Sequence, residues 1–153
     1  MNANVEMLNY TYKNAQMGQT SISHLLKVIK EDSKFKDLLK SQLKEYTVVS
    51  EASREALNKL GYETKDTNAL QKFEVYMMID IKTLTNKTPD HVAEMLIQGS
   101  TMGIIQITRR LKEYGGVVDK SVHKLATQLL SIEQHNVEEC RKFLGKPFEF
   151  APA

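Results

Sequence analysis

The chain has few of the residues that interrupt helices or cross-link a fold. Its 153 residues include only seven glycines, three prolines and one cysteine, and no tryptophan. So few helix-breaking residues predict long helices. The single cysteine, Cys140, has no partner within the chain for a disulfide, which fits a reducing compartment. We interpret it as a small residue in or beside the core rather than as a nucleophile.

Blocks of one charge sign and long hydrophobic runs are missing as well. The 21 basic and 19 acidic residues alternate along the chain and leave a formal charge of +2. A groove for nucleic acid would need a basic stripe with aromatic residues that stack on bases. No stretch approaches the roughly 18 apolar residues of a membrane-spanning helix, and the first residues lack the pattern of a secretion signal. We therefore expect a cytoplasmic protein that binds no nucleic acid and does not span a membrane.

Motifs of common catalytic sites are absent too. The sequence has no glycine-rich phosphate loop, no Cys-x-x-Cys pair and no Gly-x-Ser-x-Gly elbow. We interpret the histidines as surface or boundary residues. The sequence thus favours a protein without catalysis, and we assign no catalytic residue.

Helical periodicity is the main positive signal in the sequence. Apolar residues recur at three- and four-residue spacing in segments that cover residues 5–30, 34–60, 66–87, 88–115, and 119 or 121 to 144. A short turn joins the first two segments, so they should form an antiparallel hairpin. At about 1.5 Å per residue, the segment 66–87 is long enough to be a helical crossover along a bundle. We expect one domain over 1–153, with 146–153 as a peripheral tail.

The predicted helix over 88–115 is apolar on nearly all sides, and we predict that it is the most buried element. Thr88 is its expected N-cap and Pro89 its first helical residue. A kink at Pro89 within one longer helix is the alternative. The methionines Met77, Met78, Met95 and Met102 are interpreted as adaptable core filler, and an exposed methionine-rich binding face is the alternative.

The helix predicted over 34–60 carries polar residues where its apolar stripe should continue. Leu39 and Val49 belong to the stripe. Helical spacing between them places Gln42, and then either Glu45 or Tyr46, on the side that faces the core. We therefore expect polar groups at mid-length in the interior.

An internal repeat relates the two halves of the chain. The dipeptide Met-Gly occurs at 17–18 and again at 102–103, each time followed by isoleucine at the same distance. Both partner helices end in Leu-Gly. If the repeat is structural, Gly18 and Gly103 are equivalent points at which helices approach closely, because glycine puts no side chain in the way.

This architecture of two hairpins, a long crossover and pseudo-two-fold symmetry resembles the ferritin-like superfamily. Phrases such as AEMLIQGSTMG and LLSIEQHN also look similar to small uncharacterised ferritin-like bundles of Gram-positive bacteria. The resemblance covers nearly the whole chain as architecture and only a few residues as motif. It implies an all-α, ferritin-like four-helix bundle of two antiparallel hairpins, with its crossover at about 66–87.

Metal-binding members of that superfamily place one Glu on each of two helices and Glu-x-x-His on each of the other two. Here Glu45 and Glu133 match the glutamates of the two pairs, but Val48 and Asn136 stand where the histidines belong. His135 is two residues from Glu133 and lies on another side of the helix. The di-metal site is therefore degenerate.

Counting from the hairpin turns puts glutamines at the two single-Glu positions. The candidate quartet is Gln19, Glu45, Gln98 and Glu133. Two carboxylates and two amides without imidazole would hold a di-iron centre poorly. We interpret the quartet as a buried polar layer that fixes helix register, with a weak metal site and simple exposure as alternatives.

The resemblance and the degenerate site together imply a non-catalytic structural or interaction protein that has lost its di-metal site and has no cofactor. We expect a homodimer or another protein partner. The alternative is an iron or manganese storage protein or oxidoreductase that uses Glu45, Glu94 and Glu133, with a histidine delivered from elsewhere.

Overall fold

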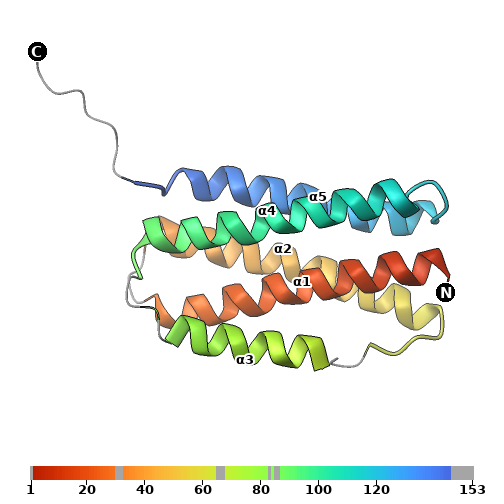
Figure 1. Cartoon of the computed structure of the whole chain (residues 1–153), viewed down its shortest axis with the longest axis horizontal. Coiled ribbons are helices and arrows are strands. Elements are labelled where there is room, and N and C mark those ends of the chain that lie inside the picture. The colour runs from red at the N-terminus through yellow and green to blue at the C-terminus, as the bar shows by residue number, and fades with distance from the viewer. Residues whose placement is uncertain (1, 30–32, 65–67, 83, 85–86, 146–153) are drawn as a thin grey trace, which may run out of the picture.

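A computed structural model describes residues 2–29, 33–64, 68–82, 84 and 87–145. These residues form five helices and no strand (Figure 1), which confirms the all-α prediction. The helices are α1 (Ala3–Val28), α2 (Lys34–Lys59), α3 (Asn68–Lys82), α4 (Pro89–Tyr114) and α5 (Lys120–Arg141). The predicted tail, 146–153, and parts of the linkers around α3 lie outside the described residues.

The helix ends follow from capping residues in the sequence. Ser33 Oγ accepts a hydrogen bond from the backbone N–H of Lys36, at 3.3 Å, and starts α2. Gly61 has φ +86°, the left-handed conformation that commonly ends a helix after its C-cap. The predicted end of α5 at Leu144 is wrong by three residues. Beyond Arg141 the chain tightens into turns with hydrogen bonds from residue i to i−3.

Pro89 breaks the chain into two helices. Thr88 has extended backbone angles, φ −67° and ψ 150°, and its hydroxyl accepts a hydrogen bond from the backbone N–H of His91 at 3.3 Å. Proline costs nothing as the first helical residue, because the N–H that it lacks would have no partner there. The break that we preferred is confirmed, and the kinked single helix is wrong.

The four long helices lie alongside one another as two hairpins. α1 packs along α2, and α4 packs along α5. α5 also contacts α2 and α1, and α1 contacts α4. α2 and α4 run in one direction, whereas α1, α3 and α5 run in the other (Figure 1). α3 therefore carries the chain back along the molecule, from the end where α2 stops to the end where α4 starts.

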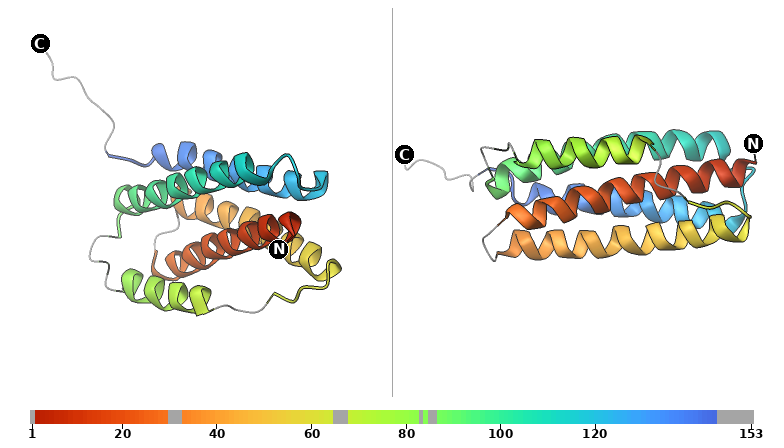
Figure 2. Two further views of the ribbon diagram at one scale, coloured as in Figure 1. Left: turned by 45° about the vertical axis from the view of Figure 1, so that its right-hand side comes forward. Right: turned by 90° about the horizontal axis from the view of Figure 1, so that it is seen from below.

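α3 packs on α1 and not inside the group of long helices. The left view of Figure 2 shows α1 between α3 and α4, and the right view shows α3 and α4 displaced to the same side of α1. One face of α3 turns inward: Ile81 is buried, and Phe73 and Met77 are half-buried. Among the described helices, none packs along the flank of α4 that faces α3.

The prediction that α4 is the most buried helix is wrong. Its fully buried residues are Val92, Ala93, Ser100 and Ile107, whereas α1 and α2 bury eight residues each. Met102 of α4 is 55% exposed. A helix that is apolar on all sides needs cover on all sides, and here α5 and α1 cover only part of it.

None of the described helices combines the length and the apolar character of a membrane-crossing helix.

Candidate functional site

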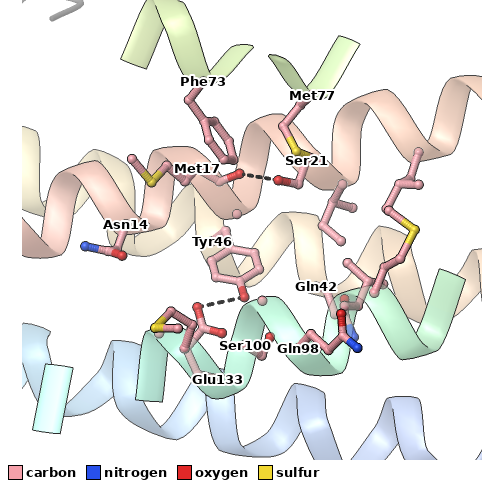
Figure 3. Close-up of a pocket in the computed structure, with 18 of the residues that line it drawn as sticks. Asn14, Met17, Ser21, Gln42, Tyr46, Phe73, Met77, Gln98, Ser100 and Glu133 are labelled. Carbon is pink, nitrogen blue, oxygen red and sulfur yellow. Dashed lines mark hydrogen bonds between the residues drawn. The ribbon is translucent and has the colours of Figure 1, made fainter. Parts of the chain in front are cut away.

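A cleft of about 580 Å³ lies between α1, α3 and α4, along the flank of α4 on which no described helix packs. α2 and α5 contribute its floor through a few residues (Figure 3). Its chief lining residues are Met17, Gly18, Ile22, Gln42, Tyr46, Phe73, Tyr76, Met77, Asp80, Met95, Gln98, Gly99, Ser100, Met102, Gly103 and Glu133.

The walls of the cleft are mainly apolar. Met17 comes from α1, Phe73 and Met77 from α3, and Met95 and Met102 from α4. Phe73 and Met77 extend from α3 toward α1 in Figure 3. Three of the four methionines that the sequence singled out thus line a cavity. Met77 packs against the core, as the core-filler interpretation predicts, whereas Met102 is 55% exposed and does not.

Gly18, Gly99 and Gly103 also line the cleft. A Cβ on Gly18 would lie 2.6 Å from the ring of Tyr46, and one on Gly103 would lie 3.3 Å from Cδ of Glu133. The two glycines that the repeat relates therefore make room for side chains of the partner helix. Gly18 makes room for Tyr46 and Gly103 makes room for Glu133, and these two side chains are hydrogen-bonded to each other.

Glu133 is the buried polar residue at the floor of the cleft, and only 6% of it is exposed. The Tyr46 hydroxyl donates a hydrogen bond to its Oε1 at 2.9 Å, and the Ser100 hydroxyl is a second partner of the carboxylate. Asn136 donates from Nδ2 to the Tyr46 hydroxyl oxygen at 3.2 Å. Four residues from α2, α4 and α5 thus form one buried network.

The electrostatics of this network are those of a carboxyl group without a counterion. In the described part of the chain, none of the ion pairs involves Glu133. Burial raises its pKa to about 7, although the hydrogen bonds from Ser100 and Tyr46 oppose the rise. Burial, with the nearby Glu133 charge, likewise raises the pKa of Tyr46. Near neutral pH the carboxyl group is therefore poised between its two protonation states.

The candidate quartet is spread over different surroundings. Glu133 is buried in the network, and Gln98 lines the cleft as an exposed residue. Gln19 is half-buried, and its side-chain oxygen is buried with no hydrogen-bond partner. None of the hydrogen bonds among the described residues joins two of the four side chains. The polar layer that surrounds Glu133 has Tyr46, Ser100 and Asn136 as its other members.

Tyr46, and not Glu45, takes the core-facing position that the sequence left open. Tyr46 is 4% exposed and Gln42 is also buried, while Glu45 is half-buried. Partial burial raises the pKa of Glu45, and the charge of His135 opposes the rise. Glu94 is exposed.

The residues of the alternative metal site, Glu45, Glu94 and Glu133, therefore have three different environments. Within 2–29, 33–64, 68–82, 84 and 87–145, no group of three or more His, Cys, Asp or Glu side chains is arranged to hold a metal ion.

Sequence reasoning missed Tyr46 as the partner of Glu133, and it missed Ser100. Asn136 was noticed only as the residue in place of a histidine. Its position three residues after Glu133 puts both side chains on one face of α5, and this is the signal that could have linked it to the network. Ser100 gives no such signal, because its contact with Glu133 depends on how α4 packs on α5.

Comparison of the chain with protein-family models gives no match. Comparison with curated proteins also gives none, and no solved structure matches it. The cleft and its buried network are therefore the features of the molecule that point to a function.

Proposed function

We propose that this chain is a non-catalytic binding protein, built on a ferritin-like four-helix bundle without a complete di-metal ligand set, which holds an apolar ligand in the cleft between α1, α3 and α4. The directions of the four long helices support the bundle part of the proposal. α2 and α4 run in parallel and a helical crossover joins them (Figure 1), as in bundles whose two hairpins are connected by one long link.

The cleft is the observation that carries the proposal. Its volume of about 580 Å³ lies within the range of roughly 300–1,000 Å³ typical of small-molecule sites. Its walls are mainly apolar and carry a limited number of polar groups, with Glu133 and Tyr46 on the floor and others such as Gln98 on the walls. Mostly apolar walls with few polar groups are the usual composition of such sites. Met102 and Tyr76, at 55% and 65% exposed, are large side chains that a ligand would remove from water.

Filling the cleft should weaken binding. Gly99 lines it, and a Cβ at this position would meet nothing within 4 Å. Gly99→Trp should therefore place an indole ring in the space without displacing the core. We expect the affinity for Nile red, a neutral apolar dye, to fall at least about tenfold, the equivalent of about 1.4 kcal/mol. A fluorescence titration measures the change.

Thr101→Trp is the matched control, since Thr101 is exposed on the same helix and does not line the cleft. It should bind the dye as the wild type does. If both variants bind with unchanged affinity, the dye is held elsewhere and the proposal fails. A melting curve for each variant shows that both are folded.

The metal-binding alternative makes a separate prediction. Protein produced with added iron and manganese should contain neither metal in stoichiometric amount, and Glu133→Gln should not change its metal content. Elemental analysis of the purified protein measures both. Stoichiometric metal that is lost in Glu45→Ala or Glu133→Ala would instead favour the storage or oxidoreductase function.

Two further expectations remain predictions. One is that the chain forms a homodimer or binds another protein, and the other is that it works in the cytoplasm.

A further inference from the structure

The charged residues of the cleft are of one sign. Asp80 on α3 and Glu133 on the floor line it, and no Lys, Arg or His side chain does so among the described residues. The chain as a whole carries a formal charge of +2. Glu133 therefore meets a cavity whose described lining has no basic side chain, and a carboxylate in such a place favours ligands with positive charge.

The Glu133 carboxylate has unused acceptor capacity. An ionised carboxylate offers about four lone-pair positions, and the Tyr46 and Ser100 hydroxyls occupy two of them. Two neutral hydroxyl donors compensate only part of the cost of burying a negative charge. A cation with N–H donors would supply both the missing charge and the missing hydrogen bonds.

The glycines of α4 leave the carboxylate open to the cavity. Gly103 of α4 lies beside Glu133 of α5, since a Cβ added to Gly103 would be 3.3 Å from Cδ of Glu133. Gly99 lies one turn earlier on the same wall of the cleft. A larger residue at either position would stand between the apolar walls and the acid. In Figure 3 the Glu133 side chain and the Tyr46 hydroxyl meet at the floor, below the α3 residues Phe73 and Met77.

We infer that the ligand is an amphipathic cation: an apolar chain or ring system that lies between α3 and α4 and carries one ammonium group, which pairs with Glu133. The inference rests on the proposed function, because it specifies the ligand of the same cleft. The apolar walls bind the body of the molecule, and the acid on the floor fixes its orientation and selects its charge.

Three ligands of equal chain length test the inference: octylammonium, octanol and octanoate. Their affinities are measured by displacement of Nile red at pH 8, above the pKa of about 7 that burial gives Glu133. The wild type should bind octylammonium at least about tenfold more tightly than octanol, and octanoate most weakly. In Glu133→Gln, octylammonium should bind no more tightly than octanol, so that the preference for the cation is lost.

Glu94→Gln removes the same charge from an exposed position of α4 that does not line the cleft, and it should keep the preference for the cation. Equal affinity of the wild type for octylammonium and octanol would overturn the inference and leave the proposed function standing. A preference that survives in Glu133→Gln would overturn it as well. If none of the three ligands displaces the dye, the inference fails, and if the dye itself does not bind, the proposed function fails with it.

Discussion

Gly18→Ala is expected to lower the free energy of unfolding by about 2 kcal/mol, although alanine is the better helix former. The new Cβ would lie 2.6 Å from the ring of Tyr46, a distance that real contacts do not show. The ring cannot move aside freely, because its hydroxyl is bonded to Glu133 and Asn136 in the interior. Overpacking typically costs about 1–3 kcal/mol, and losing the bond to Glu133 would add to it. Removing a helical glycine returns roughly 1 kcal/mol.

Gly99→Ala is the matched control, since it makes the same replacement inside a helix where the Cβ meets nothing within 4 Å. It should raise the stability by up to about 1 kcal/mol. Gly103→Ala should fall between the two, because its Cβ contact of 3.3 Å with Glu133 requires only a small shift. Denaturant unfolding of the three variants measures the order. A Gly18→Ala protein as stable as Gly99→Ala would show that Tyr46 is not held in the described position.

Helix positions could be predicted from the sequence because they depend on local chemistry. Ser33 and Thr88 accept hydrogen bonds from the N–H groups of the helices that they start, and Pro89 fits the first turn. Gly61 adopts the positive φ that ends a helix. Each signal lies within a few residues of its effect, so no knowledge of packing was needed.

The surroundings of α4 could not be predicted in the same way. Its apolar sequence fits a helix covered on all sides, and also one whose uncovered side forms a binding cleft. Which of these occurs depends on where α3 packs, and α3 packs on α1. The position of a crossover helix is a tertiary property that periodicity does not encode. The exposed Met102 and the half-buried Met95 are the result.

The candidate site was predicted in part, for a comparable reason. Helical spacing after Gln42 allowed Glu45 or Tyr46 in the interior, and the resemblance to metal-binding bundles drew attention to Glu45. Burial of Tyr46 satisfies the same spacing and buries an aromatic ring instead of a charge. Glu133 belongs to the predicted quartet and is buried, but its hydrogen-bond partner Tyr46 lies on α2, and the two meet only through helix packing.

Glu133→Gln should stabilise the protein at alkaline pH and change the way its stability depends on pH. Burial raises the pKa of Glu133 from 4.5 to about 7, so the folded protein binds this proton more tightly than the unfolded chain does. The stability that the neutral acid provides is fully present below about pH 4.5 and is lost as the pH rises through 7. At about 1.36 kcal/mol per pKa unit, this group alone should cost the wild type about 3 kcal/mol between pH 4 and pH 8.

Glutamine remains neutral throughout and can still accept the hydrogen bond from Tyr46. The difference in unfolding free energy between Glu133→Gln and the wild type should therefore move by about 3 kcal/mol in favour of the variant from pH 4 to pH 8. Subtracting the wild-type free energy removes the contributions of the titrating groups that the substitution leaves unchanged. Denaturant unfolding at several pH values measures it, and Glu94→Gln, which alters an exposed carboxylate, should show no such trend. A constant difference would mean that burial does not raise the pKa of Glu133 in the folded protein.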